Sequence, residues 1–155
     1  MFRFRAGKKI LKLHLMSHKL NKKGLLGKFI ADRIKKKIIC NFGCYISPKC
    51  SIAKTVVFPH PTGIVIGEGV VIGSNTTIYQ NVTFGSARRG QSNVSLYPKV
   101  GENVTVFAGA VIIGNITIGD NAVIGANSVV NKDVQPCKTV AGIPAKEIFK
   151  KVVKL

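Results

Sequence analysis

Residues 100–135 divide into six hexapeptides, VGENVT VFAGAV IIGNIT IGDNAV IGANSV VNKDVQ. The first position of every hexapeptide is apolar, and the fourth is Asn, Gly or Asp, residue types that tolerate a left-handed backbone. A helix cannot keep a period of six on one face, whereas short strands joined by tight corners can. The stretch therefore predicts parallel strands wound into a solenoid, with the first-position side chains filling its interior.

The same period continues towards the N-terminus, with apolar first positions at Ile66, Ile72, Ile78 and Phe84 and weaker repeats at Ile46, Ile52 and Phe58. The fourth positions, expected at the corners, are Gly69, Asn75, Asn81, Ala87, Asn103, Gly109, Asn115, Asn121, Asn127 and Asp133. Three hexapeptides close one triangular coil, and coils stack at the strand spacing of about 4.8 Å. We expect a mainly β chain, with a parallel β-helix over residues 44–135, a basic arm over 1–43 and a tail over 136–155.

Two insertions interrupt the period. The step from Phe58 to Ile66 is eight residues, so a Pro-His-Pro turn centred on His60 should bulge from the coil. After Phe84 the step is 16 residues, so residues 85–99 should leave the coil as a loop, which contains Arg88 and Arg89. Loops on a solenoid gather on a binding face, which makes both insertions candidates for the functional site.

Counting faces past both insertions predicts a row of side chains along the solenoid. If each long step covers one face, one interior column contains Phe58, Ile78, Val106 and Ile124. Two residues beyond these lie His60, Gln80, Ala108 and Ala126. A histidine followed by Gln and two alanines predicts a narrow groove with a reactive group at one end, a shape that suits a long thin ligand.

The positive charge is concentrated at the N-terminus. The formal net charge of the chain is +18, and residues 1–37 hold 13 Lys or Arg against one acid, Asp32. Apolar residues at three- and four-residue steps predict two amphipathic helices separated by Asn21–Gly24; they are Ile10, Leu11, Leu13, Leu15 and Met16, then Leu25, Leu26, Phe29, Ile30 and Ile34. The helices either cap the core or dock on anionic lipid or lipid-linked phosphates, and the sequence leaves both open. Nucleic acid is not expected, since stacking aromatic residues are lacking.

Segment composition favours a cytoplasmic location, peripheral at the inner membrane surface if the arm docks there. We find no uncharged apolar run of the roughly 18 residues that a spanning helix needs, and lysines and arginines interrupt the first 18 residues where a signal peptide would be apolar. The four cysteines, Cys40, Cys44, Cys50 and Cys137, are then expected to be reduced core residues. A zinc site from the first three and His60 lacks paired knuckle spacing, so we expect no metal.

Four stretches carry a family resemblance: HPTGIVIGE from His60, IGSNTTIYQNVTFG from Ile72, YPKVG from Tyr97 and TVAGIPAK from Thr139. They resemble the hexapeptide acetyltransferases, especially the serine acetyltransferases and the polysaccharide O-acetyltransferases close to them. The resemblance implies a left-handed parallel β-helix and a homotrimer with acetyl-CoA in a groove between adjacent subunits. It also implies His60 as general base, with backbone groups at Ala108 and Ala126 lining the pantetheine channel.

The expected site follows from the row and the resemblance together. We assign acetyl-CoA binding to Gln80, Gly85, Ala108, Ala126 and Lys146. In the tail, Lys138, Lys146, Lys150 and Lys151 would attract the nucleotide phosphates, although a solvated tail explains them about as well. The neutral imidazole of His60 would take the proton of an acceptor hydroxyl as that hydroxyl attacks the thioester.

Two departures from the serine acetyltransferases guide the expected acceptor. Tyr45 stands where that family has an Asp that orients the base, and Tyr97 stands where it has a second histidine. The long helical N-terminal domain usual in that family is also replaced by a basic arm. We therefore expect an O-acetyltransferase acting on a sugar hydroxyl of a cell-surface polysaccharide precursor. The alternatives are a serine O-acetyltransferase of cysteine biosynthesis and a non-catalytic basic scaffold.

Overall fold

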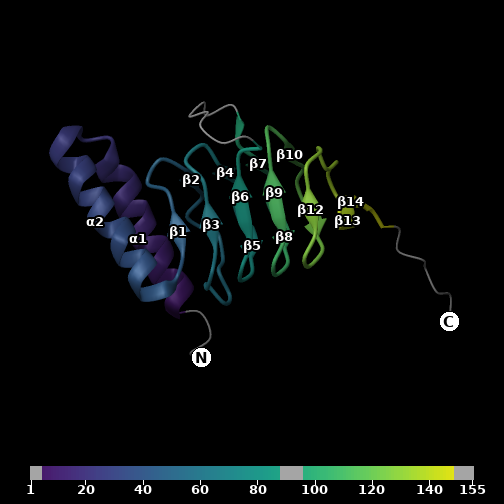
Figure 1. Ribbon diagram of the computed structural model, residues 1–155, viewed down its shortest axis with the longest axis horizontal. Coiled ribbons are helices and arrows are strands. Elements are labelled where there is room, and N and C mark those ends of the chain that lie inside the picture. Colours follow the sequence, from purple (N-terminus) through teal and green to yellow (C-terminus); the bar gives the residue numbers. More distant parts are fainter. Residues whose placement is uncertain (1–4, 88–95, 149–155) are drawn as a thin grey trace.

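Three parallel sheets form the walls of a solenoid in the computed structural model of the chain, which describes residues 5–87 and 96–148 (Figure 1). Sheet A contains β1 (Tyr45–Ile46), β3 (Val65–Ile66), β6 (Thr83–Gly85), β9 (Val111–Ile113) and β12 (Val129–Val130). Sheet B contains β2 (Ser51–Ile52), β4 (Val71–Ile72), β7 (Lys99–Val100) and β10 (Thr117–Ile118). Sheet C contains β5 (Thr77–Ile78), β8 (Thr105–Val106), β11 (Val123–Ile124), β13 (Thr139–Gly142) and β14 (Ala145–Glu147).

The interior of the solenoid is filled as the hexapeptide period predicts. Every first-position side chain from Ile46 to Val130 is buried, and Phe58 and Phe84 are among the largest fully buried ones. Strands two or three residues long place one side chain inward and its neighbours outward, since side chains alternate across a strand. The inward side chains then stack coil upon coil because the strands pair in register, as Ile66 does with Phe84 and Phe84 with Ile112.

Asparagine turns most of the corners. Positive φ angles of 54–60° are found at Asn75, Asn81, Asn103, Asn121 and Asn127, where the side-chain amide makes this conformation tolerable. Of the other fourth positions, Gly109 also has a positive φ, but Gly69, Asn115 and Asp133 do not. Beside Asn115 the positive φ, 101°, belongs to Gly114, one residue earlier. Glycine has no Cβ to clash, so it takes the corner in preference to the asparagine beside it.

Two helices, α1 (Arg5–Asn21) and α2 (Gly24–Phe42), lie together across the N-terminal end of the solenoid (Figure 1). Their boundaries confirm the separation predicted at Asn21–Gly24. The faces that they bury differ from the expected ones: α1 buries Gly7, Ile10, Leu11, His14 and Ser17, and α2 buries Gly27, Ala31, Ile34 and Ile38. Of the five apolar residues predicted to pack in the second helix, only Ile34 does, because small residues let the two helix backbones approach.

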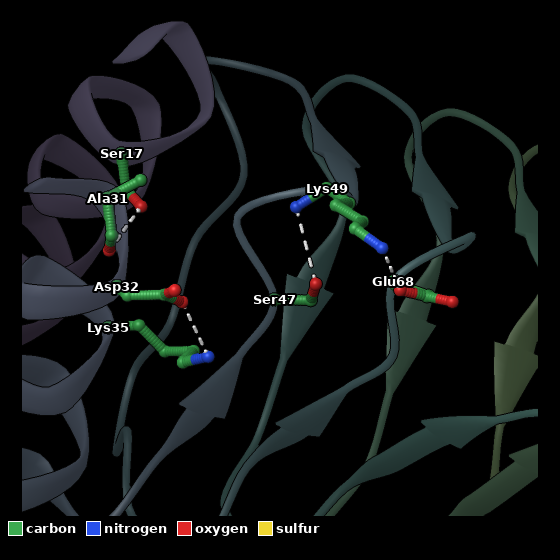
Figure 2. A network of polar contacts seen from close by, with 7 residues as sticks. All are labelled: Ser17, Ala31, Asp32, Lys35, Ser47, Lys49 and Glu68. Atoms are coloured by element: carbon green, nitrogen blue, oxygen red, sulfur yellow. Dashed lines mark hydrogen bonds and ion pairs between the residues drawn. The ribbon is translucent and has the colours of Figure 1, made fainter. Parts of the chain in front are cut away.

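Polar contacts fix the arm and the first coils (Figure 2). The Ser17 hydroxyl donates a hydrogen bond to the carbonyl oxygen of Ala31 at 3.1 Å and so joins α1 to α2. Lys49 and Glu68 form an ion pair of 2.7 Å between neighbouring coils. The Lys49–Glu68 pair is exposed and stabilises little, so the apolar interior holds the coils together.

The chain continues sheet C beyond residue 135, the end expected for the β-helix. β13 pairs in parallel with β11, and β14 turns back antiparallel to β13. Of the cysteines, Cys44 and Cys50 are buried as expected, but the expectation is wrong for Cys40 and Cys137, which are exposed. Among the described residues, no helix is long and apolar enough to cross a membrane.

Candidate active site

The strand pairing confirms the column on which the predicted row depends. Val57 bridges to Thr77, which pairs with Thr105, which in turn lies beside Val123, so four successive coils contribute to sheet C. The loop after β6 leads from sheet A to β7 in sheet B, and it therefore covers one face, as the count assumed. Gln80, Ala108 and Ala126 occupy equivalent corners of consecutive coils. The corner before them is Thr62, because the amides of Asn81, Gly109 and Asn127 donate to the carbonyls of Thr62, Gln80 and Ala108 in turn. The prediction that His60 itself occupies this corner is wrong by two residues: His60 stands just before it, in the insertion.

His60 lies in an open hollow whose second wall belongs to the arm. The hollow is lined by Pro59–Thr62 from the insertion, by Ala6 from α1, and by Asn41, Phe42 and Gly43 at the end of α2. Sequence reasoning missed these arm residues. The sequence does contain a clue to this contact, the two small residues Ala6 and Gly7 within a stretch rich in lysine. Gly7 packs directly on the backbone of Phe58, where a Cβ would overlap the carbonyl oxygen.

Hydrogen bonds hold the backbone of the His60 insertion to two other segments, Gly43–Cys44 and the corner at Asn81. The amide of Gly63 donates to the Gly43 carbonyl at 3.1 Å, and the amide of Asn81 donates to the Thr62 carbonyl at 2.8 Å. The Cys44 thiol donates to the Pro61 carbonyl at 3.3 Å, and burial raises the pKa of this thiol, which keeps it a donor. The exposed imidazole is therefore mounted on an ordered turn.

Aromatic rings extend from His60 along the row. The Tyr79 ring centroid lies 6.5 Å from that of His60, and Phe107 stacks on Tyr79 at 5.3 Å with an interplanar angle of 18°. Both residues occupy the second position of a hexapeptide, where this chain mostly has glycine, and that substitution is the signal that sequence reasoning overlooked. Stacked rings of this kind form a flat apolar wall beside the imidazole.

No side chain in the described ranges hydrogen-bonds the His60 ring. The Asp that orients the base in the similar family, and that Tyr45 replaces here, therefore has no substitute among these residues. Tyr45 lies on the outer face of β1, with the Lys35 ammonium 5.9 Å from its ring. Tyr97 lies against the backbone of Gly67, at the other edge of sheet A from the His60 corner. Neither tyrosine contacts His60 within the chain.

Gln80 occupies the second place in the row and carries an unsatisfied polar atom. Its side-chain Oε1 is buried and has no hydrogen-bond partner in the part of the chain that the structure describes. Its backbone carbonyl accepts a bond of 3.0 Å from the amide of Gly109 on the next coil. A buried amide oxygen without a partner is costly, so its position suggests a missing ligand group.

The remaining predicted binding residues do not all join the row. Ala108 and Ala126 follow Gln80 along it, and Lys146 on β14 pairs with Ala141 near its far end. Gly85 ends β6 at the opposite edge of sheet A, so it lies off the row of its own chain. Lys138 forms an ion pair of 2.7 Å with Glu147, which partly neutralises the charge that would attract a phosphate. Arg88, Arg89, Lys150 and Lys151 lie outside the described residues.

Metal chemistry has no visible basis in the described ranges, 5–87 and 96–148. They contain no cluster of three or more His, Cys, Asp or Glu side chains placed to hold an ion. His60 is instead surrounded by proline, aromatic and backbone groups. The arrangement as a whole offers one imidazole beside a hollow, continued by a row of small side chains along the solenoid axis.

Comparison with known families identifies the architecture. A family described as Bacterial transferase hexapeptide (six repeats) matches residues 97–132, and one described as Hexapeptide repeat of succinyl-transferase matches residues 55–80. The chain belongs to the hexapeptide-repeat transferases. This membership, with the parallel sheets and the two helices, confirms the expected left-handed β-helix with an N-terminal helical arm.

Within this family the chain is similar to serine acetyltransferases. It is 44% identical over 133 residues to the serine acetyltransferase of Staphylococcus aureus (strain Mu50). The matched residues make up 84% of this chain and 60% of the relative. The solved serine acetyltransferase of Neisseria gonorrhoeae superposes with a TM-score of 0.87 at 37% identity, over 94% of this chain and 56% of that one. A solved serine acetyltransferase in complex with CoA superposes with a TM-score of 0.81 at 37% identity, over 90% of this chain and 55% of its own chain.

These similarities correct the expected acceptor. The polysaccharide O-acetyltransferase interpretation is wrong, because the similar proteins are serine acetyltransferases at up to 44% identity. Tyr45, Tyr97 and the short arm weighed too heavily in that interpretation. The chain spans only about 60% of the length of the relative from Staphylococcus aureus.

Proposed function

We propose that the chain is an acetyl-CoA-dependent serine O-acetyltransferase with His60 as its general base. The observation that carries the proposal is the neighbourhood of His60: its ring lies 6.5 Å from that of Tyr79, in the insertion that precedes the corners of Gln80, Ala108 and Ala126. The solenoid itself superposes on serine acetyltransferases. A solved serine acetyltransferase of Neisseria gonorrhoeae is described in complex with serine, and another such enzyme in complex with cysteine. Both ligands are small amino acids, which suit the hollow beside His60.

His60 supplies the proton transfer in this reaction. A serine hydroxyl is a weak nucleophile near neutral pH, and a neutral imidazole nitrogen can accept its proton. The ring nitrogen holds that proton while the hydroxyl oxygen bonds to the acetyl carbon, and then releases it to the departing thiolate. The hydrogen bonds of the insertion keep the turn fixed, and Tyr79 borders the ring on the side of the row.

The row fits acetyl-CoA, which supplies an acetyl group activated as a thioester. The small side chains of Ala108 and Ala126 leave room for a thin chain against the solenoid. The orphaned amide oxygen of Gln80 would accept a hydrogen bond from an amide N–H of such a chain. At the far end Lys146 is exposed and offers a cation to phosphate groups.

We also propose that the chain works as a homotrimer in the cytoplasm. Apolar side chains are exposed on the outer faces of the coils, namely Tyr45, Val57, Val65, Val71 and Phe107. β-branched and aromatic residues on the outside of a solenoid favour burial against a second copy. A groove closed by a neighbouring subunit would bring Gly85 and Tyr97, which lie away from His60 in their own chain, towards a partner's row.

Acetyl transfer to a panel of acceptors tests the proposal. Purified protein is mixed with acetyl-CoA and with L-serine, L-threonine or a hexose, and the loss of thioester absorbance is recorded, which avoids thiol reagents that would modify the exposed Cys40 and Cys137. We expect consumption with L-serine and none with the sugar. Binding of acetyl-CoA without any transfer to serine would overturn the acceptor, and absence of binding would favour the scaffold.

A further inference from the structure

The outward side of α2 exposes apolar side chains that no part of the described chain covers. Leu25 is 86% exposed, Leu26 73% and Phe29 60%, and Ile30 beside them is 38% exposed. Successive residues of a helix are about 100° apart, so Leu25 and Phe29 lie opposite the buried stripe of Gly27, Ala31, Ile34 and Ile38. We call Leu25, Leu26, Phe29 and Ile30 the outer face of α2.

Cations surround the outer face. Lys22 and Lys23 precede α2, and Lys28 and Lys36 are exposed on it. The Arg33 guanidinium lies 5.8 Å from the centre of the Phe29 ring, so a cation stands directly beside an apolar side chain. The one acid of residues 1–37, Asp32, already pairs with Lys35 at 2.8 Å. The surface therefore combines protruding apolar groups with unneutralised positive charge.

This combination selects the occupant. A second copy of the same face would bring its five cations, Lys22, Lys23, Lys28, Arg33 and Lys36, against the same five of the first copy, so like-charge repulsion opposes self-association through it. Nucleic acid would match the charge but would leave Leu25, Leu26 and Phe29 in water. An anionic bilayer matches both features, because its phosphates attract lysines while its acyl region accepts apolar side chains.

We propose that the outer face of α2 docks on an anionic phospholipid bilayer. Leu25, Leu26 and Phe29 enter the boundary between head groups and acyl chains, and the surrounding lysines and Arg33 contact lipid phosphates. Leu25 lies 17 residues before Phe42, about 25 Å along the helix from the hollow at His60. Docking therefore leaves the hollow open, and the inference stands independently of the proposed activity.

A single tryptophan reports insertion directly, because the chain has none of its own. Leu26→Trp is mixed with vesicles of phosphatidylcholine alone and with vesicles of equal parts phosphatidylcholine and phosphatidylglycerol. We expect a blue shift of its emission, and quenching by brominated acyl chains, only with the anionic vesicles. The control is Ile143→Trp, 75% exposed between β13 and β14. These strands lie at the end of the solenoid opposite the helices (Figure 1), so this tryptophan should show neither effect. Absence of a shift for Leu26→Trp, or an equal shift for both variants, would overturn the proposal.

Cosedimentation with the same vesicles separates insertion from simple electrostatic attraction. We expect the combined variant Leu25→Ser, Leu26→Ser, Phe29→Ser to lose at least tenfold in vesicle affinity with its charge unchanged, while Ile143→Ser binds like wild type. Unfolding curves show whether the triple variant keeps its fold. If it does not, the Leu26→Trp experiment still tests the proposal, because it does not use the triple variant. Equal binding of the triple variant, equal binding to neutral vesicles, or binding to polyglutamate but not to vesicles would each contradict a lipid occupant.

Discussion

Gln80 is the residue of the row at which we expect a bound ligand to satisfy an unpaired polar atom. Its buried Oε1 lacks a partner in the described chain, and an unsatisfied buried acceptor costs about 1–3 kcal/mol. Gln80→Met keeps the length of the side chain and removes the oxygen. We expect the free energy of unfolding to rise by up to about 1 kcal/mol and the affinity for acetyl-CoA to fall several-fold, as measured by urea unfolding and by titration.

A matched control distinguishes this from a general effect of methionine. Gln135→Met changes an exposed glutamine on the solenoid and should alter neither quantity. If Gln80→Met instead lowers stability and leaves the affinity unchanged, the amide has a structural role only, and the row loses its one observed sign of a missing partner.

At this scale the sequence predicted the row better than its surroundings. Gln80, Ala108 and Ala126 follow from counting, because a strict period fixes which residues share a corner. His60 does not, because the two-residue insertion puts Thr62 at its corner instead. Tyr79 and Phe107 were not predicted as neighbours of His60, since a period assigns positions but not the reach of a large side chain. Asn41 escaped for another reason: its place beside the insertion depends on how two helices dock, which no periodicity encodes.

Among the elements, α1 depends on the absence of a side chain at Gly7. A Cβ there would overlap the carbonyl oxygen of Phe58, which belongs to rigid backbone two residues before His60. We expect Gly7→Ala to cost roughly 2 kcal/mol by overpacking and to reduce acetyl transfer, since neighbouring Ala6 lines the hollow. Thermal unfolding and initial rates measure both effects.

Lys9→Ala is the control for that substitution, because Lys9 is exposed on the same helix. It should be close to neutral in both assays. A Gly7→Ala protein with unchanged stability and rate would mean that α1 does not pack on the insertion as described.

The contact between α1 and the solenoid should also weaken in acid. His14 is buried, its Nδ1 has no partner in the described residues, and its Nε2 lies 3.9 Å from the Cys50 sulfur. Burial, with a smaller contribution from His18, lowers the pKa of His14 to about 4, and burial raises the pKa of Cys50 to about 12, so both stay neutral at pH 7. Because the unfolded histidine binds a proton below pH 6.5, folding stability is lost as the pH falls from 6.5 to 4.

The size of this loss follows from the shift. A displacement of the His14 pKa to about 4 corresponds to about 3 kcal/mol between the ends of that window. Unfolding free energies measured across it should fall in wild type and change less in His14→Gln, which cannot titrate. Identical slopes for the two proteins would show that another group governs acid sensitivity.

The helices also show where sequence patterns mislead at the element scale. The three- and four-residue steps among Leu25, Leu26 and Phe29 predicted that this face of the helix would be buried. The residues that α2 buries include Gly27 and Ala31 instead. Small residues carry little hydrophobic signal, yet they permit the closest approach of two helices. The strands were predictable because each first position is buried by the coil itself, without reference to another element.

On the scale of the whole molecule, we expect several copies of the chain to assemble. Exposed apolar residues on the outer faces and the separation of Tyr97 from His60 within one chain both favour burial against further copies of the chain. We expect sedimentation equilibrium to give three times the chain mass of 16.7 kDa at micromolar concentration. A stable monomer that nevertheless transfers acetyl groups would remove the need for a shared groove.

If His60 is the general base, removing its imidazole must slow acetyl transfer while leaving acetyl-CoA binding intact. Initial rates with acetyl-CoA and L-serine are measured for wild type, His60→Ala and Lys9→Ala, the last being an exposed residue of α1 outside the hollow. We predict a loss of roughly 10²–10⁴-fold for His60→Ala, with acetyl-CoA affinity retained, and a rate near wild type for Lys9→Ala. A His60→Ala protein that transfers acetyl groups at the wild-type rate would show that His60 is not the base.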